Sequence, residues 1–128
     1  MINELSKQVY EANVKKGFYD DQKNIGEMLA LIHSEVSEAL ECDRKDKYDK
    51  EPIIRGGLIV SEAINEQSDN WYQDYFESQV KDTFEDELAD IMIRVMDLAG
   101  YKGIDLDTHI KAKMRYNALR PHKHGKKY

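Results

Sequence analysis

The feature that most constrains this sequence is a repeat of apolar residues at intervals of three and four positions. Between residues 24 and 42 the repeat comprises Ile25, Met28, Leu29, Ile32, Val36, Ala39 and Leu40. Such spacing places apolar side chains on one face of an α-helix, and we find no stretch that alternates as a β-strand would. Only two prolines and seven glycines interrupt the chain. The sequence therefore predicts an all-α protein.

Four or five helices are expected from this pattern. They cover residues 3–16, 24–42, 58–66, a long stretch from about 71 or 78 to 99, and a last stretch from about 105 or 107 to the residues before Pro121. Helices with one apolar face bury these faces against one another. The predicted architecture is an antiparallel helical bundle that forms a single domain over residues 1–128, as the chain length also favours.

Composition indicates a globular protein with a charged surface, because 41% of the residues are hydrophobic and 34% are charged. No apolar stretch approaches the roughly 18 residues that a membrane span needs, and the N-terminus has charges where a signal peptide would be apolar. A single cysteine, Cys42, excludes an internal disulfide. We therefore expect a cytoplasmic protein that does not enter the membrane.

The net charge of −6 is distributed unevenly. Residues 108–128 contain seven Lys or Arg and no acid, so the first 107 residues carry the other 12 cations and all 25 acids. The basic end would bind nucleic acid only if the acidic body were turned away. A small anion held together with metal ions is at least as plausible an explanation.

Two pairs of carboxylates border the apolar stripes. Glu35 and Glu38 lie in the second predicted helix, and Glu87 and Asp90 lie in the long helix. Residues three apart share one side of a helix, so packing of the stripes would bring the pairs together. Like charges at one site raise each other's pKa, and a hard divalent cation removes that penalty. Oxygen ligands suit Mg²⁺ or Mn²⁺, although simple solvation of helix-flanking acids is about equally compatible with the pattern.

One face of the last predicted helix changes character along its length. It starts with Leu106 and Ile110 and continues with Lys113, Asn117 and Arg120. Either the two cationic side chains extend to water from a partly buried helix, or the three polar residues meet phosphate oxygens. We favour the second interpretation.

Three segments resemble a known family. LALIHSEVSEALE and KDTFEDELADIMIRVMDLAG are similar to the two signature helices of MazG-like nucleotide pyrophosphohydrolases, and KMRYNALRPHKHGKKY resembles the ending of a phage and bacterial branch. The resemblance implies a homodimer or homotetramer of all-α bundles. It further implies Mg²⁺-dependent cleavage of a (deoxy)nucleoside triphosphate to the monophosphate and pyrophosphate, with Mn²⁺ as a possible substitute. Nucleic acid is not an expected partner.

The resemblance assigns roles to particular residues of this chain. The implied metal ligands are Glu35, Glu38, Glu87 and Asp90, and the implied phosphate contacts are Lys113, Asn117 and Arg120. Glu38 is our candidate for orienting or deprotonating the attacking water. Ser34 stands where many relatives have a second glutamate, which predicts a weaker metal affinity or a different metal stoichiometry.

The two acidic motifs are 49 residues apart, a longer separation than in compact relatives. We therefore interpret residues 43–75 as an elaboration, either a lid or an oligomer contact, and residues 121–128 as a basic tail. Trp71, Tyr72 and Tyr75 would either stack a base or, as is commoner for aromatics at helical spacing, pack in a core or interface.

Two other functions were considered. A carboxylate-bridged di-iron bundle uses Glu-x-x-His pairs, and no glutamate of this chain has a histidine three residues later. The alternative that stays open is a catalytically weak nucleotide- or nucleic-acid-binding helical module that uses the basic C-terminal segment. That alternative predicts dispensable acids and binding that falls steeply with salt.

Overall fold

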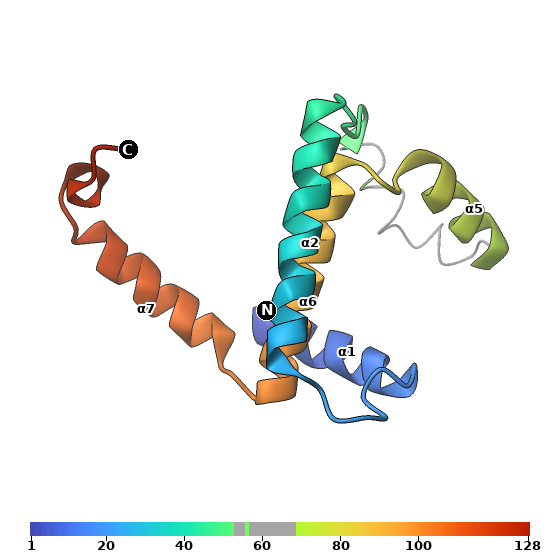
Figure 1. Cartoon of the computed structure of the whole chain (residues 1–128), viewed down its shortest axis with the longest axis horizontal. Helices are drawn as coiled ribbons and strands as arrows, with labels where there is room; N and C mark the ends of the chain where they lie inside the picture. Colours follow the sequence, from blue (N-terminus) through green and yellow to red (C-terminus); the bar gives the residue numbers. More distant parts are fainter. Residues whose placement is uncertain (53–55, 57–68) are drawn as a thin grey trace. The chain divides into compact units, whose positions relative to one another are not determined.

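The computed structural model describes residues 1–52, 56 and 69–128. These residues form five α-helices and no strand, which confirms the all-α prediction (Figure 1). The elements are α1 (Ile2–Lys15), α2 (Ile25–Arg44), α5 (Asp69–Gln79), α6 (Phe84–Lys102), α7 (Leu106–Ala118) and the 3₁₀ turn η1 (His122–Gly125). The short helix predicted over 58–66 lies outside the described residues. None of the described helices is long and apolar enough to cross a membrane.

The chain divides into two compact units. The first unit comprises residues 1–28 and 93–128, and the second comprises residues 29–92. Because α2 and α6 continue across the division, each helix contributes one end to each unit.

In the first unit, the beginnings of α1 and α7 are joined by reciprocal hydrogen bonds. The Asn3 side chain donates to the Asp105 carboxylate at 2.7 Å, and the Asn3 backbone N–H donates to Asp107 at 3.1 Å. Asp105 also caps α7 by accepting from the Thr108 N–H at 3.1 Å. The hydrogen bonds from Asn3 and Thr108 lower the pKa of Asp105 to about 2. These contacts fix where α7 begins.

The core of the first unit contains a close approach between α1 and α6. A Cβ atom on Gly100 would lie 2.7 Å from the Ser6 carbonyl oxygen and 2.8 Å from Tyr10 Cβ, so only glycine fits. Beside it the Tyr19 ring packs against those of Tyr10 and Tyr101, with centroids 4.9 and 5.0 Å apart. Burial and the adjacent Asp97 carboxylate raise the pKa of Tyr19 well above its ordinary range.

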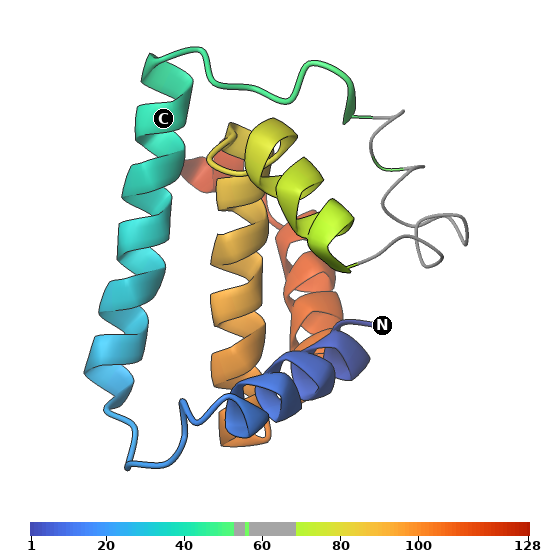
Figure 2. The same cartoon turned by 90° about the vertical axis from the view of Figure 1, so that its right-hand side faces the viewer.

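In the second unit, the C-terminal part of α2 and the N-terminal part of α6 run antiparallel and side by side (Figure 2). The residues after α2 fold back onto the start of α6. The Phe84 N–H donates to the Lys47 carbonyl at 2.8 Å, and the Tyr48 ring lies over the Phe84 ring. Cys42 Sγ donates to the Asp82 carbonyl at 3.4 Å. The first turn of α6 is thereby held against the end of α2.

The start of the long helix at about residue 71 is wrong, because residues 80–83 separate α5 from α6, and the alternative start at about residue 78 lies six residues before Phe84. Asp82 adopts a left-handed backbone conformation with φ of 61°. The Thr83 hydroxyl accepts from the Asp86 N–H at 3.3 Å, and the Asp86 carboxylate accepts from the Asp82 N–H at 3.0 Å. This exchange resembles a capping box, so α6 begins here as a separate helix.

The predicted apolar stripe of α2 is buried only in part. Ala39 is buried, whereas Leu29, Val36 and Leu40 are 47%, 49% and 49% exposed. On α6, Leu88 and Met92 are each 45% exposed. The second unit therefore carries an apolar face that the described part of the chain leaves largely uncovered.

Candidate metal centre

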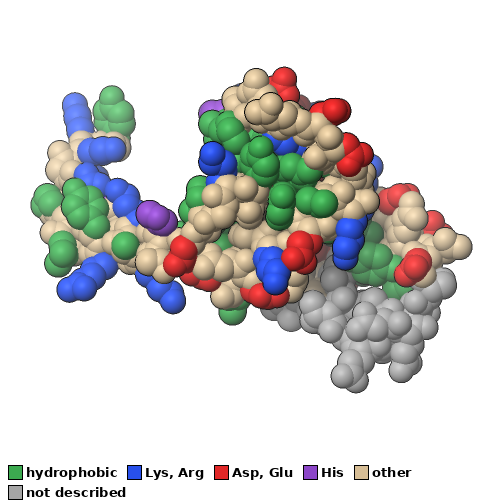
Figure 3. Space-filling model, turned by 90° about the horizontal axis from the view of Figure 1, so that it is seen from below, with side chains coloured by type: hydrophobic (Ala, Val, Ile, Leu, Met, Phe, Trp, Pro, Cys, Tyr) green, Lys and Arg blue, Asp and Glu red, His purple; other side chains and the backbone are tan. Residues whose placement is uncertain are grey.

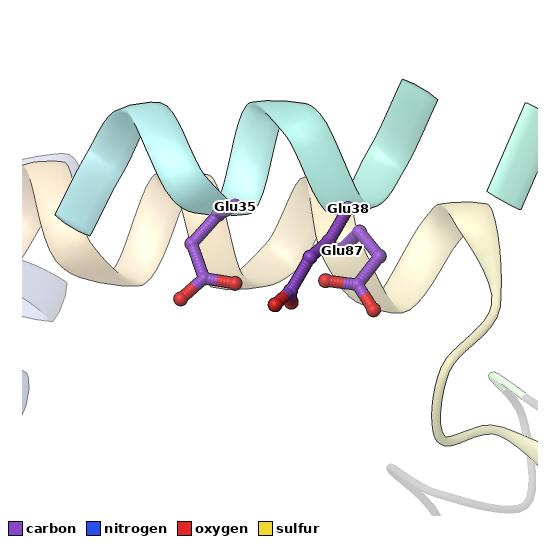
Figure 4. A group of neighbouring side chains, drawn as sticks. All are labelled: Glu35, Glu38 and Glu87. Carbon is purple, nitrogen blue, oxygen red and sulfur yellow. The ribbon is translucent and has the colours of Figure 1, made fainter. Parts of the chain in front are cut away.

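Three carboxylates from α2 and α6 converge in the second unit. Glu35, Glu38 and Glu87 each place one carboxylate oxygen so that the three oxygens lie within 4.8 Å of one another. Figure 4 shows the three side chains extending toward the same side of the helix pair. Glu35 and Glu38 lie one turn apart on α2, and Glu87 lies in the first turn of α6. The structure thus brings together three of the four acids predicted as ligands.

The three acids differ in exposure. Glu35 and Glu87 are only 7% and 5% exposed, whereas Glu38 is exposed. Glu87 Oε2 is buried without a hydrogen-bond partner in the described part of the chain. Within that part, no Lys or Arg comes within 4.0 Å of Glu38 or Glu87. A buried carboxylate oxygen without a partner is costly, so this geometry favours an added positive charge or a proton.

Burial raises the pKa of Glu87 to about 7, and the Glu38 carboxylate adds to the effect by its charge and by a shared hydrogen bond. Smaller contributions come from Asp90 and Asp86. The Glu87 carboxyl therefore keeps its proton at higher pH than an ordinary glutamate does. A divalent cation would displace that proton, and an all-carboxylate donor set fits Mg²⁺ or Mn²⁺.

Asp90, the fourth predicted ligand, lies one turn after Glu87 on α6 and is half-buried. It is not one of the three residues whose oxygens meet within 4.8 Å. Its charge nonetheless acts on Glu87, so it lies near the centre. In the described geometry Asp90 is a peripheral member of the acidic cluster.

Cys42 borders the acidic cluster, a placement that the sequence analysis missed. Its side chain is buried, and burial followed by the Glu87 charge raises the pKa of the thiol. The signal was present in the sequence, because Cys42 follows Glu38 by four residues and Glu35 by seven and therefore shares their side of α2. The neutral thiol contributes packing next to Glu87.

Of the predicted phosphate contacts, Lys113 and Asn117 lie on α7 and Arg120 lies just after its end, all in the first unit. Lys113 is exposed, and its Nζ lies 4.9 Å from the centroid of the Tyr116 ring. Arg120 Cζ lies 5.7 Å from the same centroid. The Asn117 side-chain oxygen is buried without a partner among the described residues. Tyr116 was not among the predicted site residues, although it follows Lys113 by three residues on α7, a spacing that indicated the contact.

The aromatic residues of α5 stack mainly on one another. The rings of Trp71 and Tyr75 lie 5.3 Å apart and nearly parallel, and those of Tyr72 and Phe76 lie 6.2 Å apart. None of the α5 residues is buried, and both expected roles of these rings stay predictions.

No family model, curated protein or solved structure matches this chain. The functional argument is therefore based on the acidic cluster, on α7 and on the motifs of the sequence.

Proposed function

We propose that this protein is a Mg²⁺-dependent nucleoside triphosphate pyrophosphohydrolase of the MazG-like kind. The observation that carries the proposal is the convergence of Glu35, Glu38 and Glu87, together with the buried Glu87 Oε2, which has no hydrogen-bond partner among the described residues. Simple solvation of surface acids does not explain a cluster in which two of three carboxylates are buried. The motifs that resemble the family contain all three residues.

Each acid has a proposed role in this reaction. Glu35 and Glu87 are the buried ligands, and Glu38 and Asp90 complete the acidic set. Bound Mg²⁺, or Mn²⁺ in its place, would neutralise phosphate charge and acidify a water molecule. Glu38 is the exposed member of the cluster, so it is the residue that can orient the attacking water and accept its proton.

The resemblance assigns the contacts to the phosphates to Lys113 and Asn117 of α7 and to Arg120 just after it. Lys113 and Arg120 provide positive charge and Asn117 an amide group, which together suit phosphate oxygens. The water attacks the α-phosphorus, the bond to the bridging oxygen of the β-phosphate breaks, and pyrophosphate leaves with that oxygen. The products are the nucleoside monophosphate and pyrophosphate.

We also propose that the protein acts as a homo-oligomer in the cytoplasm. The support is the exposed apolar face formed by Leu29, Val36 and Leu40 on α2 and by Leu88 and Met92 on α6. Contiguous exposed apolar residues mark association surfaces. A second copy of the chain would bury them as a domain core does.

The test is a product analysis of nucleotide hydrolysis. The full chain would be incubated with each NTP and dNTP in Mg²⁺ or EDTA, and the products separated by ion exchange. Glu38→Gln and Glu87→Gln are the test variants. Glu41→Gln is the matched control, because Glu41 is an exposed acid one turn further along α2 that pairs with Lys45.

The expected result is metal-dependent formation of monophosphate and pyrophosphate that both test variants reduce at least about a hundredfold, while Glu41→Gln retains wild-type activity. Release of orthophosphate with a diphosphate would contradict the proposed bond. Binding of nucleotide or nucleic acid without any turnover would favour the binding module instead.

A further inference from the structure

One cation of α7 and one just after its end share an aromatic ring. Lys113 Nζ lies 4.9 Å and Arg120 Cζ 5.7 Å from the centroid of Tyr116, both within the range of cation–π attraction. Lys113 precedes Tyr116 by three residues on α7 and so shares its side of the helix, whereas Arg120 follows the end of α7 and approaches the ring from the turn after it. The Tyr116 side chain is 56% exposed, so these contacts are made at the surface.

No acid competes for these two cations in the described part of the chain. Neither Lys113 nor Arg120 has a carboxylate within 4.0 Å there, and residues 108–128 contain no acid at all. The hydrogen bond of Arg120 runs from its guanidinium to the His124 carbonyl at 3.4 Å. Figure 3 shows Lys and Arg side chains interspersed with apolar ones along α7. The Tyr116 ring thus contacts two positively charged groups that no described carboxylate neutralises.

We propose that Tyr116 is a positioning residue that holds Lys113 and Arg120 together as a site for the oxyanions of a polyphosphate. Two like charges repel, and the negative face of the ring offsets part of that repulsion. An ammonium group offers a compact charge and a guanidinium offers a planar fork, so the pair can contact neighbouring phosphate groups. Ordering both side chains before binding lowers the entropy cost of capturing the ligand.

The identity of the ligand as the triphosphate of a nucleotide rests on the proposed function, whereas the role of Tyr116 rests on the contacts within α7. The binding experiment therefore uses inorganic tripolyphosphate in EDTA, titrated calorimetrically into the full chain. This probe contains neither base nor metal. It reports on the α7 site whether or not any nucleotide is hydrolysed.

Tyr116→Leu should weaken tripolyphosphate binding about fivefold, since it removes two exposed cation–π contacts, and Tyr116→Phe should remain within about twofold of wild type. Lys113→Gln and Arg120→Gln should each weaken binding more than the charge-matched controls Lys111→Gln and Arg115→Gln, which lie outside the ring contact. Circular dichroism would check that each variant retains its helix content.

A double-mutant comparison separates positioning from any other effect of the ring. If Tyr116 acts through the cations, Tyr116→Leu should have no further effect in a chain that already carries Lys113→Gln and Arg120→Gln. An equal loss in both backgrounds would overturn the inference. Equal effects of the test and control lysine and arginine variants, or preferential binding of a single-stranded DNA oligonucleotide over tripolyphosphate, would also overturn it.

Kinetics separate failure of this inference from failure of the proposed function. With nucleotide substrate, Tyr116→Leu should raise KM about fivefold and leave kcat within about twofold, because it removes binding that the ground and transition states share. Absence of turnover together with Tyr116-dependent tripolyphosphate binding would reject the proposed function and support the inference. Turnover with unchanged KM and unchanged tripolyphosphate binding in Tyr116→Leu would reject the inference alone.

Discussion

Glu87 shows how a buried acid connects the fold to the proposed chemistry. It sits in the first turn of α6, is 5% exposed and leaves one carboxylate oxygen without a partner in the described residues. A side chain chosen for stability alone would be apolar at such a position. A metal-binding role would explain why the chain has an acid here despite its cost in stability.

The raised pKa of Glu87 predicts how stability depends on pH without metal. The folded protein holds the proton up to about pH 7, whereas the ordinary value is 4.5, so the folded state binds more protons between these values. Stability in EDTA should therefore fall as pH rises from about 5 to 8. Thermal unfolding across this range checks the prediction.

Glu87→Gln should remove most of that pH dependence, because glutamine does not titrate. The variant should also be more stable than wild type at pH 8 in EDTA, and Mg²⁺ should stabilise wild type but not the variant. The same slope in the variant and the wild type would contradict the assignment of the raised pKa to Glu87.

The close approach at Gly100 gives a second prediction at this scale. Gly100→Ala should destabilise the protein by about 1–3 kcal/mol, because the new methyl group would meet the Ser6 carbonyl and Tyr10 Cβ at less than 3.0 Å. Chemical denaturation measures the loss. Gly56→Ala is the control, since no described atom lies within 4 Å of an added Cβ there. Unchanged stability of Gly100→Ala would contradict the described packing of α1 on α6.

At the scale of elements, periodicity predicted the helices well where a single apolar stripe dominates. The bounds of α1, α2 and α7 lie within about two residues of those expected, and of the two expected starts of α7 the structure has Asp105 as the cap. The break between α5 and α6 was missed because the spacing of apolar residues gives no information about a local helix cap. Thr83 and Asp86 carried that information as a Thr-x-x-Asp pattern.

Thr83→Ala tests the importance of that cap. Loss of the hydroxyl acceptor should cost about 1 kcal/mol of stability, because the Asp86 N–H loses its partner at the start of α6. Since Glu87 lies in the same first turn, metal affinity should fall as well. Thr108→Val, in the first turn of α7, provides a comparison in which stability changes and metal affinity does not. Equal metal affinity in Thr83→Ala and wild type would show that the cap does not position Glu87.

At the scale of the whole molecule, the sequence predicted the convergence of three acids, wrongly added Asp90 to that group, and did not predict how much apolar surface stays exposed. The pairing of Glu35 and Glu38 with Glu87 followed from two stripes that pack on each other. The exposure of Val36 and Leu40 could not be predicted in this way. An apolar stripe shows which face of a helix is apolar, but it does not show whether the same chain covers that face. The described fold therefore leaves room for association between copies.

Val36→Lys tests that association. If α2 packs against a second copy, a lysine at the centre of the exposed face should shift the protein to a smaller species in analytical ultracentrifugation. Val14→Lys is the control, since Val14 is a similarly exposed apolar residue of α1, at 43%. A monomeric wild-type protein would contradict the proposed oligomer.

The account depends most directly on whether the three carboxylates bind a divalent cation. Electron paramagnetic resonance of Mn²⁺ would measure this binding in wild type, Glu35→Gln, Glu87→Gln and the control Glu41→Gln, with Mg²⁺ as competitor. We predict saturable Mn²⁺ binding to the wild type at pH 7.5, and Mg²⁺ should displace the Mn²⁺. Binding should weaken below about pH 7, and the two test variants should bind Mn²⁺ with at least tenfold lower affinity. Equal Mn²⁺ binding in all four proteins, or none in wild type, would contradict the metal centre.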